Sequence, residues 1–148
     1  MTKFIHPSKR AKFKGRTGHS FLALPSDLLA HPAFVTLSHK SKALLLDLGQ
    51  QYNGHNNGDL TITWCLMSKR NWRSKQTLRA ALEELMARGF VQRTRQGGRF
   101  WPSLYAITWQ PINECGGKLD VNATRVAGRD WRHWSPPDGP IPCNVQPD

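Results

Sequence analysis

Two short stretches of the chain concentrate side chains that are long, polar and mostly cationic. Arginine and lysine neutralise phosphates, serine and threonine hydroxyls donate to them, and arginine and glutamine can also form paired hydrogen bonds with base edges. These residue types predict nucleic-acid recognition. The candidate DNA contacts are Arg73, Ser74, Lys75, Gln76, Thr77 and Arg79 in the first stretch, and Arg93, Arg95, Gln96, Gly97 and Arg99 in the second.

The first stretch opens a predicted amphipathic helix over residues 75–88. Ser74 suits the N-cap because its hydroxyl can accept a hydrogen bond from a free backbone amide, and Gly89 suits the left-handed position after a helix. Gln76 and Arg79 fall on the exposed side, where both can reach bases from one groove. The core-facing stripe, with the spacing i, i+3, i+4, i+7, is Leu78, Ala81, Leu82 and Leu85.

The second stretch lies in a predicted β-hairpin. Residues 90–95 and 104–109 are rich in strand-forming residue types, and Gly97-Gly98 between them suits a tight turn. We expect the tip of the hairpin to present cations to a partner. The residues expected to follow a DNA backbone or minor groove are Arg95, Gln96, Gly97 and Arg99.

The elements before residue 73 must position these two stretches. In chain order they are expected to be a strand at 21–24, a helical turn at 25–29, a helix at 39–52, a loop at 53–59, a strand at 60–62 and a helix at 63–70. The whole order predicts an α+β fold, a winged helix-turn-helix with a basic N-terminal arm and an irregular C-terminal tail. The expected parts are an arm over residues 1–19, a winged-helix domain over residues 20–112 and a tail over residues 113–148.

Several motifs carry a resemblance to a known group of proteins. They are Leu24-Pro25, residues 51–60, residues 72–78, residues 94–99 and residues 103–105. Through these motifs the predicted domain resembles the small winged-helix proteins of bacteriophages and integrated mobile elements, which are similar to the N-terminal DNA-binding domains of phage and plasmid replication initiators. The resemblance implies sequence-selective binding of double-stranded DNA, in transcription regulation or replication initiation. Because the sequence shows neither the apolar segment of a signal peptide nor a membrane-length apolar run, we expect a cytoplasmic location in a bacterial host cell.

Positive charge is distributed unevenly along the chain. The net charge is +11, and residues 60–109 hold nine Lys or Arg against two Glu. Residues 1–18 hold six more Lys or Arg and no acid, in a composition typical of segments that are disordered alone. Such an arm can settle along phosphates or into a minor groove. Its candidate contacts are Lys9, Arg10, Lys12, Lys14 and Arg16.

The predicted tail has no hydrophobic periodicity, apart from one aromatic and basic cluster made of Trp131, Arg132 and Trp134. Two interpretations of the cluster remain open. The tryptophans fold back to cover apolar surface of the domain, or the cluster binds a host protein complex, since Trp and Arg are favoured at binding anchors. Trp101, in the hairpin, is expected in the core of the sheet rather than against a sugar.

Other classes of function find little support in the residues. The three cysteines stand far apart without a Cys-x-x-Cys pair, and the histidines lack ligand spacing, so we expect no metal and no cofactor. No nucleophile elbow, phosphate-binding loop or catalytic carboxylate pair occurs, so we expect no enzymatic activity. No apolar run reaches the ~18 residues of a membrane helix, and we expect no membrane partner. Cys65 is expected to be a buried thiol, and Glu84 a solvated carboxylate.

Two alternatives to DNA binding stay open at this stage. A winged helix can serve as a protein-interaction module that binds and inhibits a host machine. Basic winged helices can also dock on duplex RNA by its shape.

Overall fold

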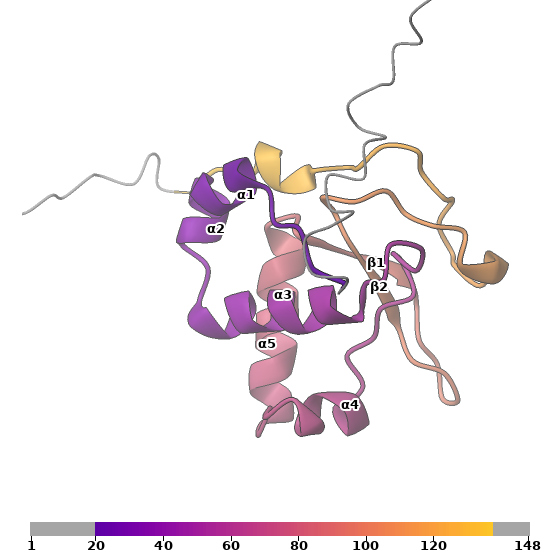
Figure 1. Ribbon diagram of the computed structural model, residues 1–148. Coiled ribbons are helices and arrows are strands. Elements are labelled where there is room, and N and C mark those ends of the chain that lie inside the picture. The colour runs from indigo at the N-terminus through magenta and orange to yellow at the C-terminus, as the bar shows by residue number, and fades with distance from the viewer. Residues whose placement is uncertain (1–19, 138–148) are drawn as a thin grey trace, which may run out of the picture.

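The computed structural model describes residues 20–137, which form a mixed α+β fold (Figure 1). Within this range the chain has five α-helices and a two-stranded antiparallel sheet. The helices are α1 (Ser26–Ala30), α2 (Pro32–Val35), α3 (His39–Gln51), α4 (Trp64–Lys69) and α5 (Lys75–Ala87). The strands are β1 (Val91–Arg95) and β2 (Leu104–Ile107), and the short 3-10 helices Cys115–Gly117 and Asp130–His133 follow them.

The two long helices, α3 and α5, supply much of the core and cross each other in Figure 1. Both begin where the sequence predicts, because a serine caps each one. Ser38 Oγ accepts from the amide of Ser41 at 3.2 Å, and Ser74 Oγ accepts from the amide of Thr77 at 3.2 Å. At the other end of α5, Gly89 adopts the expected left-handed conformation with φ of 81°. The predicted apolar stripe of α5 is buried against Leu44, Leu45 and Leu48 of α3.

The sheet has one irregularity, and it changes how two arginines are presented. The register aligns Arg93 with Tyr105, and a bulge at Thr94 precedes Arg95. The hydroxyl of Thr94 donates to the carbonyl of Gly58 at 2.5 Å, which holds the bulge in place. A bulge breaks the alternation of faces along a strand. As a result, Arg93 is exposed and Arg95 is half-buried.

Of the two shortest predicted strands, the one at 60–62 is shorter than predicted and the one at 21–24 is absent. The strand predicted at 60–62 is reduced to one bridge, in which Leu60 donates to the carbonyl of Tyr105 at 3.2 Å and accepts from its amide at 2.8 Å. Residues 21–24 form no strand, and the indole of Trp109 donates to the backbone of this segment at 3.1 Å. The order α3, Leu60, α4, α5, β1, β2 is compatible with a winged helix.

The loop between α3 and Leu60 contains a buried amide that fastens it to the end of the sheet. Asn57 is 0% exposed. Its Oδ1 accepts from the amide of Ile107 at 2.9 Å, and its Nδ2 lies 2.9 Å from the carbonyl of the same residue. The same Nδ2 also lies 3.0 Å and 2.9 Å from the carbonyls of Gln110 and Pro111. One side chain therefore satisfies several backbone groups that would otherwise be buried without partners.

The segment after β2 runs back over the body of the molecule and completes the core. Trp131 is 2% exposed and stacks on Phe90, with ring centroids 6.2 Å apart and an angle of 9° between the planes. The edge of His31 contacts the same indole, at a centroid distance of 5.2 Å. Figure 1 shows the 3-10 helix that contains Trp131 beside α1.

In residues 20–137 the longest helices have 13 residues, and none of the helices could cross a bilayer.

Candidate nucleic-acid interface

The N-terminal end of α5 is held by the turn that joins it to α4. Asp47 of α3 accepts from the indole of Trp72 at 2.8 Å and pairs with Arg70 at 2.9 Å. Asn71 lies between these two residues with φ of 69°, a conformation that Asn tolerates better than most residues. Because Trp72 is only 7% exposed, the turn is fastened to α3, and residues 73–79 start from a fixed position.

The first two turns of α5 present the expected polar face. The side chains exposed there are Arg73, Ser74, Lys75, Gln76 and Arg79. Thr77 is half-buried, so its hydroxyl lies at the edge of this face. Arg79 pairs with Glu83 one turn later at 3.3 Å, and 80% and 64% of these two side chains are exposed. An exposed pair of this kind contributes ~0–1 kcal/mol, so Arg79 can readily exchange Glu83 for another anion.

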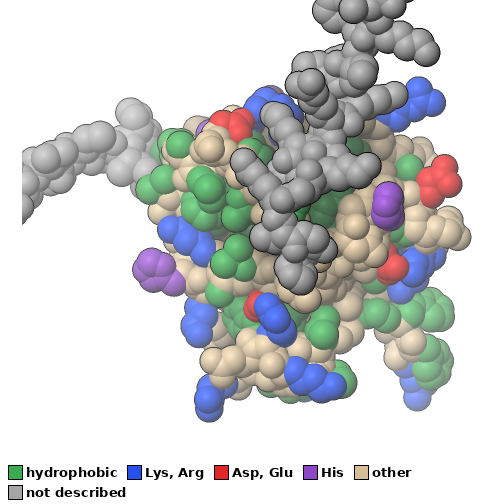
Figure 2. All heavy atoms as spheres, in the orientation of Figure 1, with side chains coloured by type: hydrophobic (Ala, Val, Ile, Leu, Met, Phe, Trp, Pro, Cys, Tyr) green, Lys and Arg blue, Asp and Glu red, His purple; other side chains and the backbone are tan. Residues whose placement is uncertain are grey.

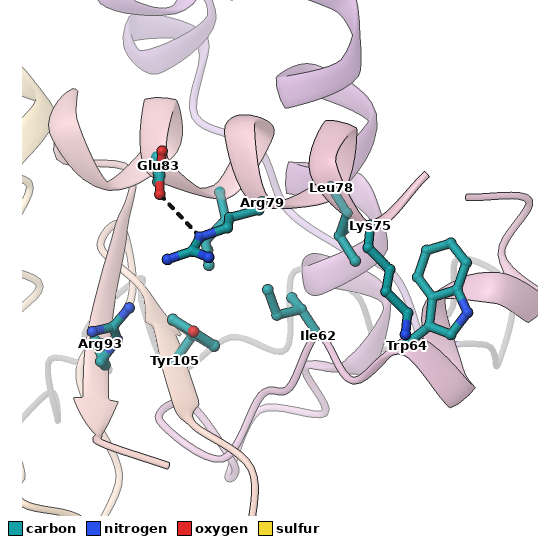
Figure 3. A pocket seen from close by; sticks show the side chains of 9 residues that line it. Ile62, Trp64, Lys75, Leu78, Arg79, Glu83, Arg93 and Tyr105 are labelled. Atoms are coloured by element: carbon teal, nitrogen blue, oxygen red, sulfur yellow. Dashed lines mark hydrogen bonds and ion pairs between the residues drawn. The ribbon is translucent and has the colours of Figure 1, made fainter. Parts of the chain in front are cut away.

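A hollow of about 390 Å³ lies between α5 and the sheet, and we call it the cationic hollow (Figure 3). Lys75 and Arg79 line it from α5, and Arg93 lines it from β1. Figure 3 shows these cations around a space whose wall includes Tyr105. The remaining lining residues are Ile62, Trp64, Leu78, Leu82 and Glu83. Three cations against one carboxylate give the lining of this hollow a net positive charge.

Aromatic rings hold two of these cations in position. The Lys75 ammonium lies 5.7 Å from the ring centroid of Trp64. The Arg93 guanidinium lies 5.9 Å from the ring of Tyr105 on the paired strand. Cation–π contacts of this length restrict the side chains without neutralising their charge. The sequence singled out both cations, but it did not assign a role to the rings beneath them.

The other candidate contacts of the hairpin are partly engaged within the protein. Arg95 donates from Nη2 to the carbonyl of Pro102 at 3.0 Å, so its side chain lies across the hairpin. The side chain of Gln96 accepts from Arg93 at 3.0 Å, and its backbone amide donates to Asp120 at 2.9 Å. These bonds brace the hairpin and leave Arg93 more accessible than Arg95.

The turn of the hairpin is not at Gly97-Gly98, as predicted, but two residues later. The amide of Gly98 donates to the carbonyl of Trp101 at 2.9 Å, which places Arg99 and Phe100 at the tip. A Cβ at Gly98 would lie 3.3 Å from the indole of Trp101, so glycine there allows the ring to lie against the backbone. The amide of Gly97 donates to Ser103 Oγ at 2.8 Å.

Two aromatic side chains, those of Phe100 and Trp101, project from this tip, and the sequence alone predicts neither position. Phe100 is 81% exposed, and the guanidinium of Arg99 lies 5.4 Å from its ring. Trp101 is 55% exposed, so its expected place in the core of the sheet is wrong. The available signal was the pair Phe100-Trp101 immediately after a cation, outside the alternation of either strand.

Lys and Arg side chains lie at several places on the face shown in Figure 2, its upper and left edges included. In Figure 2, blue Lys and Arg side chains lie along the lower edge, over α4 and the start of α5 in the orientation of Figure 1. Hydrophobic and cationic side chains stand together at the lower right, where the β1–β2 hairpin ends. The start of α5 and the tip of the hairpin therefore face the same side.

The aromatic and basic cluster of the tail serves the fold. The ring of Trp131 covers apolar surface of the domain, which is the first of the two interpretations. Because this ring is buried, it is unsuitable as an anchor for a partner. Arg132 pairs with Asp27 at 2.6 Å, which lowers the pKa of that carboxyl through a hydrogen bond. Trp134 is half-buried, with the guanidinium of Arg88 at 4.6 Å from its ring.

Some expectations concern other parts of the chain. The candidate contacts of the arm, Lys9, Arg10, Lys12, Lys14 and Arg16, lie outside the described residues. The expected burial of Cys65 is wrong, because this side chain of α4 is exposed. Among residues 20–137, no group of three or more His, Cys, Asp or Glu side chains is arranged to hold a metal ion.

Comparison with family models, with curated proteins and with solved structures finds no match for this chain. Its function is therefore inferred from the residues and their geometry.

Proposed function

We propose that this chain is a winged-helix protein that binds double-stranded DNA and selects its sequence. In this proposal α5 enters the major groove by its N-terminal half, and the β1–β2 hairpin is the wing that follows the backbone or the minor groove. The protein would act in transcription regulation or replication initiation for a phage or mobile element. It would act by binding alone, without catalysis.

The observation that carries the proposal is the cationic hollow. A helix and the strand that follows it bring Lys75, Arg79 and Arg93 to one place, with an apolar wall behind them. Cations that merely kept a protein in solution would not need to converge. Convergence between a helix and a hairpin is what combined contacts to the bases and phosphates of one groove require.

The dimensions of α5 agree with a role in the major groove. Its 13 residues span about 20 Å at ~1.5 Å per residue. The major groove of B-DNA is ~12 Å wide and admits one α-helix. Gln76 and Arg79 are both exposed on the outer side of this helix, and they suit adenine and guanine edges respectively. Arg73 and Lys75 stand at the start of the helix, where phosphates flanking the groove would lie.

The basic arm adds to this proposal from outside the described residues. Its six Lys or Arg would extend the contact along the backbone or into a neighbouring minor groove. The arm is expected to contribute affinity rather than selectivity, because contacts to phosphate carry no sequence information directly.

Selection from a random pool of DNA duplexes tests the proposal directly. We expect a consensus to emerge, and the selected duplex to bind better than duplex RNA of the same sequence. The double variant Arg79→Ala/Arg93→Ala should lose about 10-fold or more in affinity, since each contact to DNA is worth ~1 kcal/mol or more. The matched control is Arg125→Ala/Arg129→Ala, which removes the same charge from exposed positions of the tail.

Equal losses in the two double variants would show that net charge alone drives binding, and would contradict the proposed interface. Preference for duplex RNA would favour the RNA-binding alternative. Capture of one host protein from a nuclease-treated lysate, together with failure to bind any duplex, would favour the protein-interaction module.

A further inference from the structure

We propose that the hairpin tip inserts Phe100 between neighbouring base pairs of the bound duplex, so that the protein unstacks and bends its DNA. This inference rests on the proposed function and adds a second mode of recognition to it. The DNA would be read partly through how easily one base step opens. Arg99 would hold the adjoining backbone, and Trp101 would support the wedge from behind.

The ring of Phe100 is exposed to solvent. Phe100 is 81% exposed, the highest value for any large hydrophobic side chain in residues 20–137. Next to it, Trp101 is 55% exposed. Large aromatic side chains gain most from leaving water, so two of them held at one projecting point indicate a surface that is covered in the bound state.

Hydrogen bonds hold the tip of the hairpin in shape. The bond between the Gly98 amide and the Trp101 carbonyl, at 2.9 Å, closes the turn. The bond from the Gly97 amide to Ser103 Oγ, at 2.8 Å, braces the strands beneath it. Arg95 adds a third bond across the hairpin, to the carbonyl of Pro102 at 3.0 Å. Because the loop is already ordered, inserting the ring costs little conformational entropy.

Positive charge beside the ring indicates the kind of partner that the tip binds. The Arg99 guanidinium lies 5.4 Å from the centroid of Phe100, and Arg93 stands further down the same hairpin. A purely apolar protein groove would have to desolvate these cations. A nucleic acid provides phosphates that pair with the arginines and flat bases that stack on the phenylalanine.

The tip also belongs to the same hairpin as one wall of the cationic hollow. The tip is continuous through β1 with the cationic hollow, to which Arg93 contributes. The start of α5 and the tip face the same side of the molecule (Figures 1 and 2). Apolar wedges that open a base step act in this way beside a charged surface that the bent DNA then follows. An anionic membrane surface would also accept an aromatic and basic tip, but it would leave the polar face of α5 unexplained.

The test uses the full chain and the duplex obtained by selection, with 2-aminopurine placed at each position in turn. Fluorescence of this base rises when it loses its stacking partner. We expect a rise at one step, accompanied by shortening of the end-to-end distance measured by fluorescence energy transfer. Phe100→Ala should abolish both signals and weaken binding by about 10-fold or more, the effect of losing one buried aromatic group. Phe100→Leu should retain most of each signal, because leucine also serves as a wedge.

Two controls separate a wedge from other effects. Val126→Ala removes a side chain that is 76% exposed in the tail, and it should change neither signal. Phe100→Ala should leave the salt dependence of binding unchanged, because it removes no charge. If the parent protein binds the duplex, with an affinity that falls as salt rises, but no base unstacks, then the insertion of Phe100 is wrong and the proposed function stands. If the protein binds no duplex but binds anionic vesicles through Phe100, both proposals are wrong.

Discussion

The carboxylate of Glu84 on α5 accepts a 2.6 Å hydrogen bond from the hydroxyl of Ser41 on α3. The same carboxylate accepts from the hydroxyl and the amide of Ser38, at 2.8 Å and 3.1 Å, and pairs with Arg88 at 3.4 Å. The expected solvated carboxylate is therefore a half-buried link between the helix that carries the cations and the cap of α3. Burial alone would raise the pKa of Glu84, but the serine hydrogen bonds and the charge of Arg88 outweigh it and lower the pKa.

This lowered pKa gives stability a defined dependence on pH. The ionised carboxylate stabilises the fold fully above its ordinary value of 4.5, and the contribution is lost as pH falls through the lower, folded value. We expect Glu84→Gln to reduce the free energy of unfolding by ~1–2 kcal/mol near neutral pH and by much less in acid. Urea unfolding of parent and variant at a series of pH values measures this difference. Glu83→Gln, on the exposed face, should show little effect at any pH, and an identical pH profile for both variants would contradict the assignment.

A second prediction concerns the buried amide of Asn57. Asn57→Ala leaves the amide and carbonyl of Ile107 without their side-chain partner, and we expect a loss of ~2–4 kcal/mol in the free energy of unfolding. Asn57→Asp should be no better, because a carboxylate cannot replace the Nδ2 donor. Asn122→Ala, at an exposed position, should stay within ~0.5 kcal/mol of the parent. Thermal or urea unfolding compares the three, and equal stability of all of them would mean that Asn57 does not fasten the loop.

A third prediction is that phosphate contacts dominate affinity for DNA. If about five cations touch the backbone, the logarithm of the binding constant should fall against the logarithm of salt with a slope near −4 to −5, at ~0.9 per phosphate. Arg93→Ala/Arg99→Ala should reduce the magnitude of this slope by about 2 and weaken binding to all duplexes equally. Fluorescence titrations at several salt concentrations measure the slope. A slope near zero in the parent is incompatible with the interface.

A fourth prediction concerns selectivity. Gln76→Ala and Arg79→Ala leave the buried stripe of α5 intact and should change folding stability by well under ~1 kcal/mol. Against the selected duplex each should cost ~1–3 kcal/mol and relax preference at one or two base positions. Glu83→Gln serves as the control, because it frees Arg79 from its ion pair without removing a donor. Repeating the selection with each variant measures the preference, and unchanged consensus sequences from both would show that α5 does not read bases.

The long helices could be predicted from the sequence because their determinants are local. Ser38 and Ser74 cap their own helices, and the leucines of α5 lie at helical spacing within one turn or two of each other. The candidate cations of α5 and β1 followed from the same local reasoning, since a residue opposite an apolar stripe is exposed. Local rules are sufficient wherever the partner of a residue lies in its own element.

The errors arise where the partner lies far along the chain. A strand at 60–62 would need backbone partners for three residues, but only Leu60 is paired, with Tyr105. Glu84 and Ser41 are 43 residues apart in the sequence, and no neighbouring residue of either one predicts their hydrogen bond. The turn of the hairpin is a local exception, since Gly98 and Trp101 are close in sequence. There the indole of Trp101 lies against the backbone of Gly98, a contact that turn propensity does not describe. The cationic hollow lies between α5 and the sheet, and the sequence does not predict how these two elements are placed relative to each other.

The stacking of Trp131 on Phe90 has a consequence for how the protein is made. A ribosome delivers the chain from its N-terminus, so His31 and Phe90 emerge long before the indole that covers them. Until then the nascent chain exposes an aromatic surface at the junction of α5 and β1, a site for chaperones or proteases. We expect a message cut short before codon 131 to yield a product that cells clear rapidly. Only a chain that extends through Trp131 can cover Phe90 and close this part of the core.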